Sequence, residues 1–134
     1  VVANKDPLGA NLDRVQIVKG WIDEQGQPHD KVFDVSWSGD RKAEKNGKVP
    51  AVGSTVDLNT ATFSNDIGEA TLGIVWHDPE FDSTRPALYY ARVIEIPTPR
   101  WSTYDAVRAG LPLLADVPAT IQERAWTSSI WYRP

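Results

Sequence analysis

β-branched and aromatic residues gather most densely at residues 87–97, which read Ala-Leu-Tyr-Tyr-Ala-Arg-Val-Ile-Glu-Ile-Pro. Successive side chains of an extended chain point to opposite faces, so Tyr89 and Val93 share one face and Leu88 lies on the other. Both faces are largely apolar, which predicts a central strand covered on two sides. Residues 124–132 alternate in the same way and predict a neighbouring strand.

Two further segments alternate and are joined by a short turn. Residues 13–23 and 29–37 each show a period of two, and residues 24–28 between them include Gly26, which is free to adopt a positive φ. This pattern predicts a β-hairpin. The residues expected to point inward from its second strand are Phe33, Val35 and Trp37.

The middle of the chain is less regular. Residues 38–53 are polar and charge-dense, which is typical of a solvated loop between strands, although loops of this length are often functional. Residues 54–64 predict a weak strand, and residues 69–77 predict a clearer one.

A long insertion separates the two C-terminal strands at residues 97–123. Ser102 followed three residues later by Asp105 resembles a capping box, and Gly110 is placed to end the helix. We therefore expect one short helix of about two turns. Residues 1–134 are then expected to form a single all-β domain, an immunoglobulin-like antiparallel β-sandwich with one short helix in a long insertion before the last strand.

Composition narrows the possible partners. The net charge is −4, from 14 basic and 18 acidic residues that are interspersed, which argues against a nucleic-acid partner. No apolar run approaches the ~20 residues that span a bilayer, so we expect a soluble domain without membrane insertion. The chain has neither cysteine nor methionine. The missing start residue predicts a processed protein or a piece of a longer one.

One segment has residues that could bind a metal. His77, Asp78, Glu80 and Asp82 could supply a nitrogen and three carboxylates, but their spacing is not that of an EF-hand. A solvated acidic loop is the favoured interpretation, and a weak calcium site is the alternative. There is no Gly-x-Ser-x-Gly or phosphate-binding loop, so we expect neither a catalytic residue nor a cofactor in this chain.

The chain has six tryptophans, and aromatic residues with arginine dominate many interfaces. Three of them share strand faces with aliphatic residues and are expected in the core: Trp21, Trp37 and Trp76. Trp126 and Trp131 are expected on opposite faces of the last strand, so that one of them faces outward. The candidates for an interface or ligand surface are Arg100, Trp101, Tyr104, Arg108 and Trp126.

Several long motifs resemble a known family. They are residues 18–21, 32–42, 75–82, 89–106 and 122–132, which include Tyr-Tyr-Ala-Arg-Val-Ile-Glu-Ile-Pro-Thr-Pro-Arg-Trp and Gln-Glu-Arg-Ala-Trp-Thr-Ser-Ser-Ile-Trp-Tyr. Together they are similar to the C-terminal region of the bacterial domain-of-unknown-function family 3604, and they cover nearly the whole chain.

The resemblance implies a role beside a catalytic domain. Members of that family are longer, often carry export signals, and have an N-terminal part similar to PHP-type metallohydrolases. It therefore implies a periplasmic or secreted parent protein with a divalent metal in its catalytic domain. None of those metal-ligand motifs occurs here, so the resemblance transfers no catalytic residue. It implies an accessory C-terminal module that packs on the upstream domain and helps to shape it.

Two other functions stay open. Sandwiches with exposed Trp and Tyr can stack on sugar rings, so a carbohydrate-binding module is one alternative. A purely structural domain that only stabilises the longer chain is the other.

Overall fold

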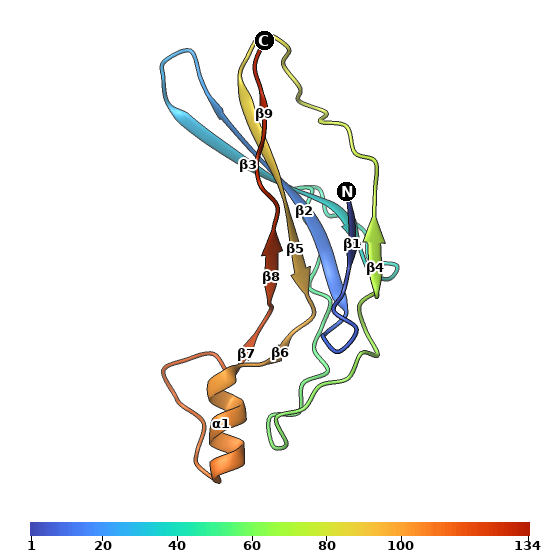
Figure 1. The fold of residues 1–134 in the computed structure, drawn as a ribbon, viewed down its shortest axis with the longest axis vertical. Coiled ribbons are helices and arrows are strands. Elements are labelled where there is room, and N and C mark those ends of the chain that lie inside the picture. The colour runs from blue at the N-terminus through green and yellow to red at the C-terminus, as the bar shows by residue number, and fades with distance from the viewer.

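The structure is a computed structural model that describes all residues from Val1 to Pro134, and it is built mainly from antiparallel strands (Figure 1). The prediction of an all-β fold with one short helix is confirmed. The elements are β1 (Val2–Asn4), β2 (Leu12–Ile22), β3 (Pro28–Trp37), β4 (Thr71–Gly73), β5 (Ala87–Glu95), β6 (Thr98–Pro99), α1 (Trp101–Ala109), β7 (Thr120–Ile121), β8 (Arg124–Trp126) and β9 (Ile130–Tyr132).

The main sheet has the order β3-β2-β5-β8, and β9 also pairs with β5. The hairpin of β2 and β3 forms as predicted. At its turn, Gly26 has a φ of 78°, and the carboxylate of Asp23 accepts the N–H groups of Gln25 and Gln27. The central position of β5, between β2 and the two C-terminal strands, is also confirmed.

A second, small sheet of β1 and β4 packs on one face of the main sheet, which we call the core face. Ala3 and Leu72 of the small sheet lie against Val15, Ile17 and other apolar residues of β2, β3 and β5. We call the opposite side, which carries Val18, the outer face. The immunoglobulin-like arrangement is not confirmed, because the small sheet has only two strands of three residues each.

A one-residue bulge lies in the last strand and corrects the prediction for its tryptophans. Between the pairs Arg92↔Trp126 and Tyr89↔Ile130, β5 advances three residues and the C-terminal segment four. Thr127 bridges the gap, because its hydroxyl accepts the N–H of Ala91 at 3.0 Å. An extra residue in one strand turns the side chains that follow it to the opposite face of the sheet. Trp126 and Trp131 therefore share the outer face, and the prediction of opposite faces is wrong.

A second bulge has the same effect in the hairpin. The register shifts between Val15 and Gln16, which pair with Ser36 and Asp34, and Trp37 pairs with Arg14. Trp37 is consequently on the outer face, not inward with Phe33, and its indole N–H donates to the Arg41 carbonyl. The three tryptophans predicted as core are half-buried.

The two middle strands are shorter than expected. Residues 54–64 contain only an isolated bridge between Asp57 and Thr62, so the weak strand predicted there is wrong. The chain turns sharply between Asp57 and Thr62, where Ala61 adopts a φ of 50°. Of residues 69–77, only Thr71–Gly73 form a strand.

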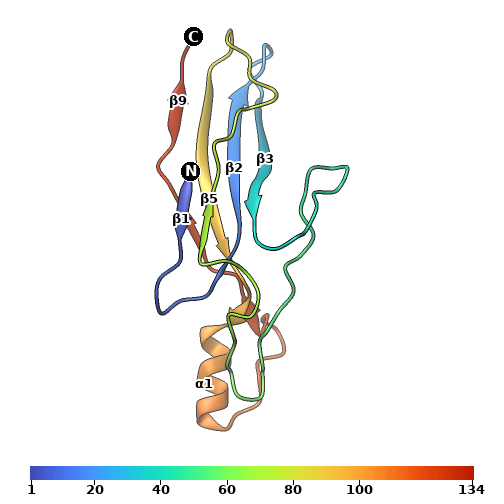
Figure 2. The same ribbon diagram turned by 90° about the vertical axis from the view of Figure 1, so that its right-hand side faces the viewer.

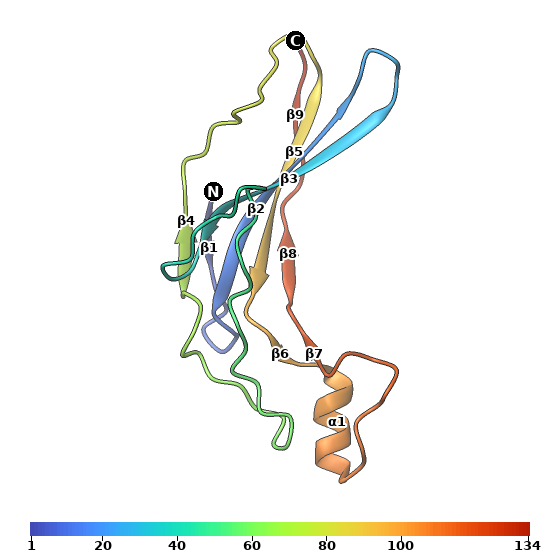
Figure 3. The same ribbon diagram turned by 180° about the vertical axis from the view of Figure 1, so that it is seen from behind.

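The polar segment after β3 is fixed to the sheet at one point. Arg41 forms an ion pair with the fully buried Asp13 at 2.8 Å and donates to the carbonyl of Pro50. Asp13 also contacts Arg14 and accepts a hydrogen bond from Gln122 of the insertion at 3.0 Å. Seen from behind, the segment between β3 and β4 runs down toward α1 (Figure 3).

The helix α1 projects beyond the end of the main sheet, opposite the C-terminus (Figures 1 and 2). Its end at Gly110 is as predicted: Gly110 is left-handed, and the N–H of Leu111 donates to the carbonyl of Ala106. The predicted capping box is wrong, because Arg100 is the N-cap and makes no side-chain cap bond. No helix of the structure is long and apolar enough to cross a membrane.

Candidate functional site

The carboxylates proposed for a metal site are each directed at a cation or a hydroxyl of the chain itself. Asp78 binds Lys19, Glu80 forms an ion pair with Lys31, and Asp82 accepts the hydroxyl of Thr84. His77 is exposed. No group of three or more His, Asp or Glu side chains in the structure could hold a metal ion.

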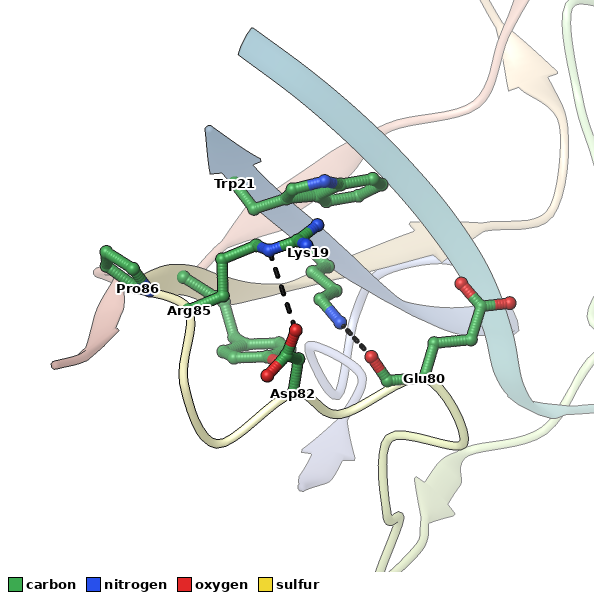
Figure 4. Close-up of a pocket in the computed structure, with 8 residues that line it drawn as sticks. Lys19, Trp21, Glu80, Asp82, Arg85 and Pro86 are labelled. Atoms are coloured by element: carbon green, nitrogen blue, oxygen red, sulfur yellow. Dashed lines mark hydrogen bonds and ion pairs between the residues drawn. The ribbon is translucent and has the colours of Figure 1, made fainter. Parts of the chain in front are cut away.

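Two of these acidic residues line a pocket of about 220 Å³ on the core face, between β2, β5 and the loop before β5 (Figure 4). Lys19 lies at its base, where its ammonium group is 2.6 Å from the Asp78 carboxylate and 2.7 Å from the Glu80 carbonyl. The same nitrogen lies 5.5 Å from the ring centre of Trp21 and 5.8 Å from that of Tyr89. Both charged side chains of the pair are over nine-tenths buried.

Hydrogen bonds favour the ionised form of the Asp78 carboxyl. Burial alone raises the pKa of the Asp78 carboxyl, but bonds from Lys19, the Glu80 N–H and Tyr89 outweigh it, so this pKa lies below its ordinary value. The Tyr89 hydroxyl donates to the same carboxylate at 2.8 Å. Burial, and then that bond, raise the pKa of Tyr89. The cluster fastens the loop at residues 78–85 to the sheet, and its hydrogen bonds are already used within the chain.

The residues proposed for an interface lie mostly on α1. Trp101, Tyr104 and Arg108 share the outward side of the helix, while Ser102, Thr103 and Ala106 are buried on the other. The indole of Trp101 is 68% exposed. The guanidinium of Arg108 lies 5.6 Å from the centre of the Tyr104 ring, a distance suited to a cation–π contact.

The N-cap of α1 fixes the direction of the helix. Arg100 is half-buried and its N–H donates to the carbonyl of Ala119 at 2.9 Å, while the hydroxyl of Thr103 donates to the same carbonyl. The structure therefore brings together four of the five proposed residues at the α1 end. Trp126 is separate from them, on β8.

Two sets of exposed apolar residues were missed by the sequence analysis. The segment after α1 exposes Leu111, Leu113 and Leu114, which we group with the outward side of the helix as the α1 surface. Trp131 is 67% exposed beside β5, and it joins Trp126 on the outer face only because of the bulge. The three leucines lie within four residues after Gly110, so their apolar character just beyond the end of a helix was the available signal.

The total exposed area is large for the mass. A compact monomer of 14.9 kDa exposes about 7,000 Å², whereas this chain exposes 8752 Å². The excess of about 1,700 Å² exceeds the ~800 Å² that one partner commonly contributes to a stable interface.

The sequence matches one protein family over its whole length. Residues 1–134 match the model of the family described as "Protein of unknown function (DUF3604)". The chain belongs to this family. No curated protein and no solved structure matches it. Membership in the DUF3604 family confirms the family that the sequence motifs resemble, and the match extends over the α1 surface, the pocket and all three sheets, including the short pair of β6 and β7.

Proposed function

We propose that this chain is a non-catalytic accessory module that packs through its α1 surface on another domain of a longer DUF3604 protein and helps to shape that domain. The observation that carries the proposal is the exposure of Trp101 on α1 and of Leu111, Leu113 and Leu114 just after it, at the end of the molecule where the helix projects from the sheets. The resemblance in the sequence implies that the partner is an upstream PHP-like, metal-dependent hydrolase domain.

The composition of the α1 surface supports docking. Trp, Tyr and Arg are enriched among residues that contribute most to binding, whereas scattered surface leucines are not. Here Trp101, Tyr104 and Arg108 form one outward side, and leucines extend the apolar area beyond the helix. Exposed apolar residues that gather in one region of a soluble domain are typical of interaction sites.

The charged residues support a non-catalytic role. Lys19 and Asp78 satisfy each other below the pocket, and Asp13 is enclosed by Arg14, Arg41 and Gln122. In both networks each buried charge has a partner of opposite charge within the chain, as buried charges require.

A calorimetric titration of the chain with the separately produced remainder of the longer protein tests the proposal. Trp101→Ala should weaken docking by ~2 kcal/mol or more, the range for an interface anchor. Trp131→Ala is the matched control, because Trp131 has nearly the same exposure, 67% against 68%, on a different surface. Equal affinity for Trp101→Ala and the unmodified chain would refute docking through α1.

A carbohydrate-binding role is a second candidate, and the outer face favours it. Trp126 and Trp131 are both exposed there, beside the half-buried Leu88 and Tyr90. Two rings on one face of a sheet suit stacking on successive sugars. Polysaccharide should then shift the Trp fluorescence of the chain, and Trp131→Ala should reduce the shift while Trp101→Ala leaves it. No shift across a broad glycan panel would reject this candidate.

A further inference from the structure

The small sheet covers only part of the core face of the main sheet. A groove of about 380 Å³ lies between β1 on one side and β5 and β8 on the other. Its walls are formed by all three residues of β1 and by residues of the β5–β8 edge, including Val93 and Ala125.

The β1 side of this groove is a free strand edge. Just outside the two strands, the N–H of Ile74 donates to the carbonyl of Val1 and the N–H of Lys5 donates to that of Ala70. Pairs with and without hydrogen bonds alternate along an antiparallel ladder, so Ala3 between them also forms a hydrogen-bonded pair. The residues between them, Val2 and Asn4, form the pairs without hydrogen bonds, and their backbone N–H and C=O groups point to the opposite edge. Both residues are exposed and line the groove. An unpaired edge of this kind is a template for another strand.

The floor of the groove is apolar and open to solvent. Ala125 pairs with Val93, whose side chain contacts the core, so Ala125 lies on the core face although it is exposed. Beyond the groove, further along the same face, Ile130 pairs with Tyr89 and is 73% exposed. A strand beside β1 would cover this row of residues on the uncovered part of the face.

Two carboxylates, those of Glu95 and Glu123, line the groove, and each is two residues along the chain from a residue of the floor. Glu95 follows Val93 on the core face, and its N–H donates to the carbonyl of Glu123. Burial, and then the charge of Glu123, raise the pKa of Glu95. Of the nearby cations, Lys5 is bonded to three carbonyls of the loop after β1, and Arg124 is exposed at the rim. The two carboxylates therefore favour a cationic side chain in the occupant.

We propose that an extended segment of the neighbouring domain adds to the free edge of β1 as a third strand of the small sheet. Its inward side chains are small or β-branched and cover Val93, Ala125 and Ile130, and a Lys or Arg lies over Glu95 and Glu123. Main-chain hydrogen bonds supply the affinity in this mode, and alternate side chains supply the specificity. This inference rests on the proposed docking and adds the second surface that the neighbouring domain contacts.

Residue-resolved amide exchange of the full-length protein, compared with that of the 134-residue chain, tests the inference. In the chain alone the amides of Val2 and Asn4 should exchange rapidly, because nothing accepts their hydrogen bonds. In the full-length protein we expect both to exchange at least about 100-fold more slowly, as paired strand amides do. Equal rates in the two proteins would overturn the inference.

A matched pair of variants separates pairing from a general change in β1. Proline is tolerated at a strand position whose N–H is not used in the ladder. Asn4→Pro removes a groove-facing donor, and Thr71→Pro removes a donor at the opposite edge of the small sheet. Both lose the same side-chain hydrogen bond between Thr71 and Asn4. In the full-length protein, Asn4→Pro should speed the exchange of Val2 by at least about 10-fold, and Thr71→Pro should leave it slow. Equal effects of the two variants would contradict strand addition.

The same measurement distinguishes failure of this inference from failure of the proposed function. The indole N–H of Trp101 reports docking through α1. Protection of Trp101 without protection of Val2 and Asn4 would keep the docking and overturn the third strand. Absence of protection at all three positions would overturn both.

Discussion

The covered and open parts of the core face use the same kind of residue and differ in exposure. Ala91 on β5 is 4% exposed beneath the small sheet and its neighbours, whereas Ala125 on β8, one strand away, is exposed. Both alanines point to the same face. The difference comes from the short β1–β4 sheet, which closes the core over β2 and β3 and stops before β8. An apolar strand position on this face is thus either buried or exposed, depending on what lies above it.

A charge placed at each alanine gives the largest expected contrast. Ala91→Glu would bury a carboxylate without a partner, so it should cost ~4 kcal/mol or more in the free energy of unfolding. Ala125→Glu should change it by no more than about 0.5 kcal/mol, as an exposed substitution. Urea unfolding of the 134-residue chain measures both values. Similar costs at the two sites would show that the covered and open parts of the core face do not differ as described.

The buried and exposed ion pairs provide the next contrast. Lys19→Met leaves Asp78 buried without its cation and should cost ~3 kcal/mol. Lys31→Met removes the partner of Glu80 at a site where both side chains are about half exposed, so it should cost less than about 1 kcal/mol. The same unfolding experiment compares them, and a larger loss for Lys31→Met would contradict the assignment of Lys19 as the anchor of the loop.

Acid should weaken the buried pair in a defined direction. The pKa of Asp78 is lowered by folding, so the unfolded chain binds more protons and stability rises with pH. Its contribution is complete above the unfolded-state value of about 3.9 and is lost as pH falls through the folded-state value. The unfolding free energy should therefore decline below about pH 4, and less steeply in Lys19→Met. An identical decline in both proteins would contradict this source of acid sensitivity.

The smallest effect is expected at the rim of the groove. Because folding raises the pKa of Glu95, the ionised folded state is disfavoured, and stability falls as pH rises through the unfolded-state value and then the folded-state value. Glu95→Gln should stabilise the chain at pH 7 by up to about 0.5 kcal/mol and have no effect near pH 3. A gain at pH 3 as large as that at pH 7 would exclude the ionised carboxylate, through its burial and its repulsion by Glu123, as the cause.

Regular alternation was sufficient to predict the hairpin and the central strand. It could not locate the bulges, because a period of two assumes one residue against one along the whole ladder. At Thr127 a side-chain oxygen accepts a bond that a backbone carbonyl would otherwise accept, and this places Trp131 beside Trp126 on the outer face. That bond forms only when the segment pairs with β5, so the alternation within one strand does not show it.

Features of the candidate site that depend on neighbouring residues were visible in the sequence, whereas contacts between distant residues were not. Arg100 and Trp101 were proposed because an aromatic residue flanked by Arg stands in an insertion, and the structure places Trp101 exposed on α1. The partnership of Lys19 with Asp78 was not, since the two residues are 59 positions apart and only the folded loop brings them together. Likewise, Gly110 marked the end of α1 by its own conformation, while the start at Arg100 lacks any side-chain cap.

Hydroxyl-radical footprinting of the full-length protein and of the 134-residue chain tests the central claim most directly. Trp101 is 68% exposed in the chain, and Leu8, which is 96% exposed on the loop after β1, serves as an internal reference. Docking through the α1 surface predicts that oxidation of Trp101 falls several-fold relative to Leu8 in the full-length protein. Equal relative oxidation of Trp101 in the two proteins would contradict the account.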